Sequence, residues 1–551
     1  MPDQLRRTGG VHYTPHDVGS QVLDLAIDSL GGLPGAVCDP ACGSGAFLLT
    51  VAERLVAEGV GAHEVLRSRI SGVELDPQAA ATARQALSRW AAEHGESVGP
   101  EQIRIHQGDA LQIPAGRWPG RPDGGFDLVI GNPPFLNQLS LATVRGPARR
   151  SAVATRFGPL GAYTDDAGLF LLLGLELLAA DGVVAMIQPQ SVLSARDAAP
   201  VRARLRQEGR LVALWAHLGT PFPDADVHVC APVVRRGRAA PEPAGSSVGD
   251  VAQEDADGGS AHDRVQVVWD DETEVHHGAA WLAAGAPRWG ALLGAARGIP
   301  DIPLLRGRPL REVATATAGF RDEFYALCEA LRVAAPDASG ERPDAGSPRL
   351  VTVGMIDPML LRHHSAQHRI GGARVTAPTV DMAALTTAHP RVGRWAAARL
   401  RPKVLVATQT RIVEAVADPE GDCVPMTPSI SVEPIDDLID VWYLVAALGA
   451  PPVAAFAVRE HLGTGRSASA LRWSAAGVLE VSLPVDAELW DRGAALAREL
   501  HRHDPAPTTP GTAVTTRQAL LDEFGVVMTE AHGLAGDHPV VAWWSERIPR
   551  R

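Results

Sequence analysis

The segment at residues 36–56, AVCDPACGSGAFLLTVAERLV, limits the fold of this chain more than any other. A short apolar run ends in Asp39, a turn with Gly43 and Gly45 follows, and an apolar stretch with helical spacing begins directly after it. Glycines let a backbone pass close to a ligand, and the first turn of a helix offers free amide groups. The pattern predicts a strand, a turn able to bind a ligand and a helix, although a plain structural turn also fits it.

Further apolar runs alternate with amphipathic stretches through the first 235 or so residues. Buried strands are predicted at 36–40, 70–76, 103–107, 126–130, 182–189 and 211–218, with an amphipathic helix at 77–94. This alternation is typical of a mostly parallel sheet covered by helices. We therefore expect an α/β domain over residues 1–235.

Carboxylates stand at the ends of the predicted strands. Glu74 ends the second strand, where it can take both hydroxyls of a ribose, and Asp109 ends the third, where it can accept from an adenine amine. Together with Asp39 they predict a nucleoside pocket at the carboxyl edge of the sheet.

A second motif, FDLVIGNPPF at 126–135, places Asn132, Pro133, Pro134 and Phe135 directly after a buried strand. A proline-stiffened turn explains these four residues alone, but it does not explain their spacing to the carboxylates. Two oxygen acceptors that hold the hydrogens of a planar amine out of plane expose its lone pair, so the motif suits chemistry at such an amine.

This set of motifs resembles the class I S-adenosylmethionine-dependent methyltransferases, and NPPF resembles their amino-methylating signature. The resemblance implies a Rossmann-like domain with S-adenosyl-L-methionine as cofactor. The side-chain oxygen of the Asn and the carbonyl of the first Pro would accept from the target amine, and the aromatic ring would stack on the base. These catalytic roles fall on Asn132, Pro133, Pro134 and Phe135. Cofactor contacts fall on Asp39, Ala41, Gly43, Gly45, Glu74 and Asp109.

Residues 9–26 contain a YTP segment at 13–15 that, with the amphipathic stretch after it, resembles the first motif of gamma-class N6-adenine DNA methyltransferases, and it adds Thr14 to the cofactor contacts. A helix cap at Thr14 is compatible with this role. Residues 163–209 and 218–234 resemble later motifs of the same group, in its TaqI-like form. One departure is Ala198, which stands where our alignment expects a second aromatic against the flipped base.

The resemblance implies site-specific methylation of adenine N6 in double-stranded DNA, with the base flipped out of the duplex. Two arginine-rich stretches, 144–157 and 391–411, suit phosphate contact, although charged stretches are often solvated faces. The net charge of −13 argues weakly against a nucleic-acid partner, but its distribution matters more. The expected DNA contacts are Arg145, Arg149, Arg150, Arg394, Arg401 and Lys403.

Residues 236–263 are rich in Gly, Pro, Ser, Asp and Glu, so we expect a partly disordered linker or insertion over 236–299. Residues 300–551 mix strand and helix patterns and predict an α+β domain, which the resemblance makes the target-recognition domain that binds DNA. Lys403 is the only lysine and has no acidic neighbour, so we expect no restriction-nuclease core in this chain.

Several alternatives share these motifs. An amino-methyltransferase acting on cytosine N4, on RNA or on protein glutamine also fits residues 36–135. A non-catalytic DNA-binding specificity protein on the same fold fits less well, because the cofactor and NPPF residues are all present.

The five cysteines are scattered, which predicts neither a disulfide framework nor a metal site. No apolar run is long enough for a transmembrane helix, and we expect a cytoplasmic protein that binds no membrane. The family resemblance further implies a restriction-modification or phage-defence setting, with a separate nuclease or defence-operon proteins as partners.

Overall fold

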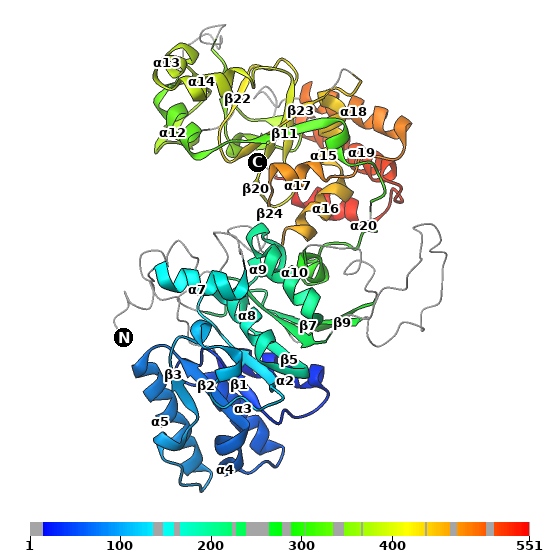
Figure 1. Ribbon diagram of the computed structural model, residues 1–551. Coiled ribbons are helices and arrows are strands. Elements are labelled where there is room, and N and C mark those ends of the chain that lie inside the picture. The colour runs from blue at the N-terminus through cyan, green and yellow to red at the C-terminus, as the bar shows by residue number, and fades with distance from the viewer. Residues whose placement is uncertain are drawn as a thin grey trace. The chain divides into compact units, whose positions relative to one another are not determined.

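The structure is a computed structural model of the 551-residue chain, and it forms two compact units, Met1–Ala296 and Arg297–Arg551 (Figure 1). It describes residues 15–135, 147–158, 166–222, 227–237, 264–270, 272–277, 288–303, 305–333, 347–364, 367–435, 438–462, 471–502 and 512–549. Thr14 and Arg145 lie outside these ranges.

The first unit is built on one large sheet with the order β3-β2-β1-β4-β5-β8-β7-β9-β10, and β6 pairs with β8. The strands from β3 through β5 are parallel, β8 runs antiparallel to both β5 and β7, and β9 is parallel to β7. In chain order the strands are β1 (Val37–Asp39), β2 (Ile70–Glu74), β3 (Ile105–Gln107), β4 (Phe126–Gly131), β5 (Leu178–Met186), β6 (Gln188–Pro189), β7 (Gly209–Ala216), β8 (Val229–Arg236), β9 (Arg264–Trp269) and β10 (Glu272–His277).

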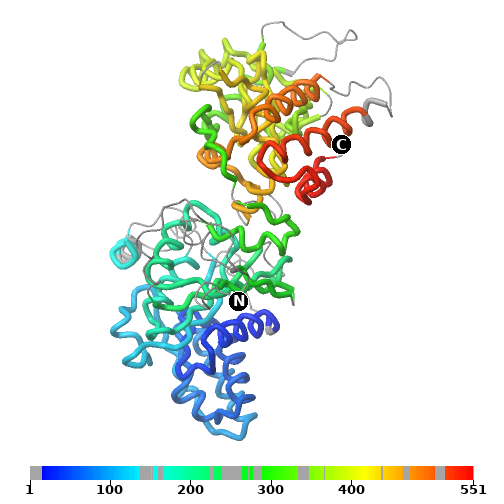
Figure 2. The backbone as a smooth tube through the Cα atoms, turned by 90° about the vertical axis from the view of Figure 1, so that its right-hand side faces the viewer, coloured from blue at the N-terminus to red at the C-terminus, as the bar shows by residue number. Residues whose placement is uncertain are grey.

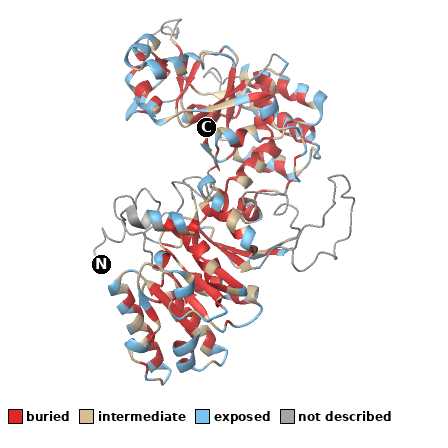
Figure 3. Ribbon diagram, viewed as in Figure 1, coloured by how far each residue is buried: buried red, intermediate tan, exposed pale blue. Residues whose placement is uncertain are grey.

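Helices pack against this sheet, and the strands between them are buried along most of their length (Figure 3). Asp76 is the N-cap of α5: its carboxylate accepts from the amides of Gln78 and Ala79. Pro77 occupies the first position of the helix. The helices are α2 (His16–Leu30), α3 (Ala46–Ala57), α4 (Ala62–Glu64), α5 (Pro77–Glu93), α7 (Pro147–Phe157), α8 (Asp166–Leu177), α9 (Ser191–Ser194) and α10 (Ala199–Glu208).

The α/β prediction for the first unit is confirmed, with two differences at its C-terminal side. The strand predicted at 182–189 divides into β5 and β6. Within the stretch 236–299, expected to be a linker or insertion, residues 264–269 and 272–277 form the strands β9 and β10, which extend the sheet. Residues 238–263, the most polar part of that stretch, lie outside the described residues.

The second unit is α+β, as its sequence predicts. Four antiparallel strands pair in the order β11-β23-β19-β21, and a second four-stranded sheet has the order β12-β18-β13-β22. The strands are β11 (Ala314–Ala318), β12 (Leu331–Val333), β13 (Arg349–Val351), β14 (Ile356–Asp357), β15 (Leu360–Leu361), β16 (His368–Ile370), β17 (Ala373–Val375), β18 (Pro378–Val380), β19 (Lys403–Ala407), β20 (Gln409–Thr410), β21 (Ala415–Asp418), β22 (Cys423–Pro425), β23 (Ser429–Pro434) and β24 (Leu471–Arg472).

The C-terminal helices α18, α19 and α20 of this unit lie side by side, in the order of the chain (Figure 2). The helices are α12 (Arg321–Glu329), α13 (Met382–Ala388), α14 (Pro390–Ala397), α15 (Val441–Gly449), α16 (Pro451–Glu460), α17 (Ala475–Leu479), α18 (Ala487–Arg502), α19 (Thr512–Ala531) and α20 (Pro539–Arg547). Among the described residues no single helix is long and apolar enough to cross a membrane. The apolar pair α15 and α16 is bent by 60° and mostly buried in the unit.

Candidate active site

The turn after β1 is shaped by its glycines. Gly43 and Gly45 have φ angles of +54° and +92°, which side chains with a Cβ rarely adopt, and Gly45 directly precedes α3. The Asp39 carboxylate is buried and accepts from the amide of Ala41 at 3.0 Å. Apart from its chain neighbours, no described residue would have an atom within 4 Å of a Cβ at Gly43, so the described part of the turn leaves open space there.

Glu74, at the end of β2, holds this turn in place. One carboxylate oxygen accepts from the Gly43 amide at 2.8 Å, and the other accepts from the Asp76 amide at 2.8 Å. A carboxylate has about four acceptor positions, so each oxygen keeps capacity for a further donor such as a ribose hydroxyl. The geometry of Glu74 is therefore compatible with the expected hydrogen bonds from both ribose hydroxyls.

Asp109 follows β3 and lies next to Glu74 along the sheet edge, because the Gly108 amide donates to the Glu74 carbonyl at 2.8 Å. Its carboxylate accepts from the Leu111 amide at 3.2 Å and from the Gln112 side chain at 2.9 Å. Since β3, β2 and β1 are adjacent and parallel, the ends of the three strands that lead to Asp109, Glu74 and Asp39 lie at one edge of the sheet.

Sequence reasoning did not single out Leu75, which follows Glu74 in the chain. This residue is 49% exposed. Its place directly after Glu74 makes it a candidate for an apolar contact with a flat ring. The available signal was the position of Leu75 in GVELDP, directly after the expected ribose-binding residue Glu74.

Asn132, Pro133, Pro134 and Phe135 follow β4 immediately, next to Asp39. Because β4 pairs with β1, a Cβ placed on Gly131 would lie only 2.4 Å from a carboxylate oxygen of Asp39. The Gly131 carbonyl also accepts from the Ile187 amide at 3.0 Å, which fixes the strand end against β5. Pro133 is buried, whereas Asn132, Pro134 and Phe135 are half-buried. The structure thus brings the two sequence motifs together.

A second aromatic ring, Phe222, lies beside Phe135. The two ring centroids are 6.3 Å apart and the rings meet edge to face, at 68°. Phe222 is in the loop between β7 and β8, whereas Ala198, where our alignment expected an aromatic, lies just before α10. Sequence reasoning missed Phe222, and the signal was the FP pair in the segment 218–234.

Burial perturbs the ionisable groups beneath the glycine turn. Burial raises the pKa of the Asp39 carboxyl to about 8; the hydrogen bond from Ala41 opposes this shift, and the Glu74 carboxylate adds to it. A cation bound nearby would favour the ionised carboxylate. Burial also raises the pKa of the Cys38 thiol to about 12 and that of Cys42 well above its usual value, so both stay protonated and unreactive.

The first arginine stretch is only partly described. Arg149 and Arg150 lie on α7, and their side chains are outside the described part. Arg156, on the same helix, has an internal role: it donates to Glu176 at 3.0 Å and to the carbonyls of Leu111 and Ile113 at 3.0 and 2.8 Å. Arg156 therefore ties α7 to the segment that follows Asp109.

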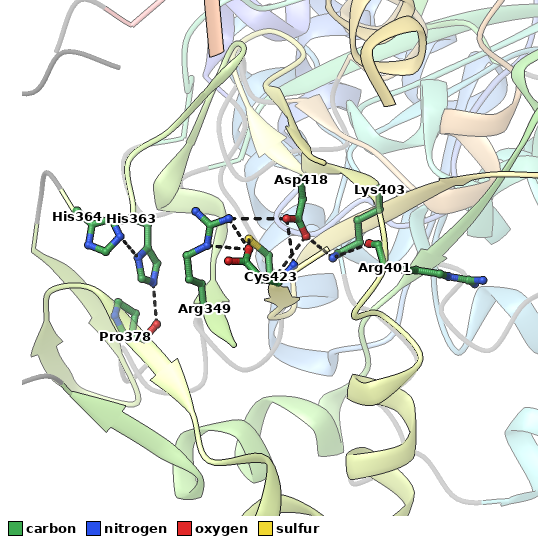
Figure 4. A network of polar contacts seen from close by, with 9 residues as sticks. Arg349, His363, His364, Pro378, Arg401, Lys403, Asp418 and Cys423 are labelled. Atoms are coloured by element: carbon green, nitrogen blue, oxygen red, sulfur yellow. Dashed lines mark hydrogen bonds and ion pairs between the residues drawn. The ribbon is translucent and has the colours of Figure 1, made fainter. Parts of the chain in front are cut away.

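The second stretch divides into exposed and buried cations. Arg394 is exposed on α14, and Arg401 is 58% exposed although it pairs with Glu433. Lys403 is wrong as a DNA contact, because its side chain is fully buried and its ammonium group pairs with Asp418 (Figure 4). Its position in the central strand β19 turns the side chain away from solvent.

The surroundings of Lys403 form a balanced ion network. Arg349 pairs with both Asp418 and Asp422, and the Cys423 amide donates to Asp418 at 3.1 Å (Figure 4). Asp418, Asp422 and Cys423 are close enough together to hold a metal ion. Two cationic side chains already neutralise the two carboxylates, so we assign the network a structural role.

Comparison with known proteins gives a consistent picture of the first unit. Residues 3–252 match the family model described as N-6 DNA Methylase. The methylase subunit of the type I restriction enzyme EcoEI of Escherichia coli is 29% identical over 195 residues, 34% of this chain and 34% of that protein. The type II methyltransferase M.TthHB8I of Thermus thermophilus is 28% identical over 244 residues, 43% of this chain and 47% of that protein.

The chain therefore spans between a third and a half of the length of these two curated relatives. A solved structure of the type IIL restriction-modification enzyme MmeI in complex with DNA has a similar fold, with a TM-score of 0.54 and 12% identity over 97% of this chain and 75% of that one. The parallel sheet, the glycine turn and the strand-end carboxylates form a Rossmann-like fold of the class I S-adenosylmethionine-dependent methyltransferase type, and residues 3–252 are similar to the N-6 DNA methylase family.

Proposed function

We propose that this chain transfers a methyl group from S-adenosyl-L-methionine to N6 of adenine in double-stranded DNA. One observation carries the proposal: the carboxylate-lined glycine turn and the Asn132–Phe135 segment meet at adjacent strand ends, where Asp39 packs against Gly131. A binding site for the methyl donor next to a binding site for the target amine can align the methyl group with that amine. Such alignment alone can supply a large part of a rate enhancement.

The pocket residues fit the cofactor. Glu74 keeps acceptor positions for the ribose hydroxyls, and the Asp109 carboxylate, at the end of the neighbouring strand, is the residue type that accepts from an adenine amine. Leu75 would offer an apolar contact to the adenine ring, and Asp39, which accepts from the Ala41 amide, would lie toward the amino-acid end of the cofactor. S-adenosylmethionine, when bound, supplies an electrophilic methyl group.

Residues 132–135 form the part of the proposed site that would bind the target base. The side-chain oxygen of Asn132 and the carbonyl of Pro133 accept hydrogen bonds from the exocyclic amine and direct its lone pair out of the ring plane. Phe135 stacks on the base, and Phe222 supplies the second aromatic contact. Both rings help to offset the few kcal/mol that flipping a base out of the duplex costs.

The second unit is proposed as the target-recognition domain. Arg391 and Arg394 are both exposed on α14 and lie one turn apart, and no acidic residue occurs between 389 and 413. Arg391 also lies over the ring of Phe320, at 5.4 Å, which holds its guanidinium at the surface. The similarity to methylases of restriction enzymes and to a restriction-modification enzyme supports a restriction-modification setting, with a nuclease or other defence proteins as separate partners. The TaqI-like subclass stays a prediction.

The test is incubation of the full chain with isotopically labelled S-adenosylmethionine and unmethylated genomic DNA, followed by nucleoside analysis. We expect labelled N6-methyladenine, and about a 100- to 1,000-fold lower rate with Asn132→Ala, as for loss of one catalytic hydrogen-bonding group. Calorimetry should show unchanged cofactor binding by this variant, because the proposed role of the Asn132 side chain is to bind the target amine. Label in N4-methylcytosine, RNA or protein alone would contradict adenine in DNA as the substrate.

A further inference from the structure

The loop between β7 and β8 reaches the candidate active site. β8 is antiparallel to both β5 and β7, so β7 runs parallel to β5 and ends at the same sheet edge as Asn132. The described part of this loop is 217–222 and 227–228. It carries Phe222, which is 2% exposed and meets Phe135 edge to face.

Two histidines hold one glycine of this loop from both sides. The amide of Gly219 donates to Nδ1 of His217 at 3.0 Å, and the carbonyl of Gly219 accepts from Nδ1 of His228 at 3.0 Å. An amide can only donate and a carbonyl can only accept, so His217 must offer a lone pair at Nδ1 and His228 must carry a proton there. The fit is tight, since a Cβ on Gly219 would lie 3.2 Å from Cε1 of His217.

The backbone of both histidines is anchored independently of their rings. Gln190 is buried, its side-chain amide donates to the carbonyls of His217 and Val229 at 3.2 Å each, and its own amide donates to the His228 carbonyl at 2.9 Å. The base of the loop is therefore fixed, and the imidazole rings act beyond it, on Gly219. Only Thr220 and Pro221 separate Gly219 from Phe222.

We propose that His217 and His228 are positioning residues that, through Gly219, hold the loop after β7 so that Phe222 faces Phe135. This inference rests on the proposed function for the role of Phe222 at the base. Neither histidine contacts the reacting atoms; each acts through the loop backbone. Loss of either ring contact frees the segment 219–222 while Gln190 keeps the strands in register.

The first measurement needs no substrate. The chain is labelled with 4-fluorophenylalanine, and its Phe222 resonance is assigned by the loss of that signal in Phe222→Leu. In His217→Ala and His228→Ala we expect the Phe222 resonance to move toward the value of an exposed ring. Asn at either position places an amide oxygen or nitrogen near the position of Nδ1, so His217→Asn and His228→Asn should keep the wild-type resonance. His63→Ala, on exposed α4, is the matched control.

The second measurement is methyl transfer from labelled S-adenosylmethionine to genomic DNA. Each Ala variant should lower kcat by about 2- to 10-fold, the effect of one ordinary hydrogen bond, with the KM for the cofactor unchanged and with both Asn variants near wild type. An unmoved Phe222 resonance in both Ala variants would overturn the proposal. The proposal would also be overturned if the Ala and Asn variants lost kcat equally and both had lowered thermal stability. Absence of methylation in the wild type contradicts the proposed function alone, because the resonance test is independent of it.

Discussion

Replacing Gly131 with alanine should disturb both halves of the site at once. The added Cβ would lie 2.4 Å from one carboxylate oxygen of Asp39, 2.9 Å from its Cγ and 3.2 Å from the other oxygen. Asp39 is buried and bound to the Ala41 amide, so it has little room to withdraw. Overpacking of this kind costs about 1–3 kcal/mol. We expect the free energy of unfolding to fall by that amount and cofactor affinity to fall about 10-fold, measured by urea denaturation and calorimetry.

A double-mutant cycle identifies the cause. In the Asp39→Ala background the obstructing carboxylate is gone, so the cost of Gly131→Ala should be lower than in the wild type by more than the roughly 0.5 kcal/mol within which independent sites add. Gly59→Ala is the matched control: its φ is +90° and no atom lies near its Cβ, so its strain of about 1–2 kcal/mol should be equal in both backgrounds and leave cofactor binding unchanged. An equal cost of Gly131→Ala with and without the Asp39 carboxylate would refute the steric coupling.

Three further predictions address other parts of the chain. Leu75→Ala should weaken cofactor binding in calorimetry by about 10-fold, because an apolar surface of about 50 Å² or more would no longer cover the adenine ring; unchanged affinity would exclude the contact. Arg394→Gln should lower the slope of log affinity for duplex DNA against log salt by about 0.9, the share of one phosphate contact, and an unchanged slope would remove Arg394 from the interface. Burial lowers the pKa of His532 to about 4 in the folded chain, so the unfolded chain binds more protons between pH 4 and 6.5, and stability is lost as the pH falls through this window. Between pH 7.5 and 5.5 the wild type should lose about 1 kcal/mol more of its free energy of unfolding than His532→Leu in urea denaturation, and parallel losses would contradict this assignment.

The parts of the site that the sequence predicted are those set by local rules. Asp39, Glu74 and Asp109 each end an apolar run, and parallel strands bring such ends to one edge whatever the rest of the fold does. The same reasoning predicts Asn132 after β4. That all four residues lie at one edge of the sheet follows from the alternation of strands and helices alone.

The missed parts depend on contacts between distant segments. Phe222 meets Phe135 only because β8 inserts between β5 and β7 and turns the intervening loop toward the site, and no local pattern contains that order. The β9–β10 hairpin was assigned to a linker because the polar residues before it dominate the composition of the stretch. Lys403 looked like part of a basic surface because a run of charge does not reveal which side of a strand each residue faces.

The burial of Lys403 has a practical consequence for work on this protein. It is the only lysine of the chain, beside 50 arginines, and its amine is enclosed and paired with Asp418. Amine-reactive dyes and crosslinkers would therefore meet no accessible lysine side chain on the folded protein. A lysine introduced at a chosen surface position would give a nearly unique attachment point, and modification of Lys403 itself would report unfolding of the second unit.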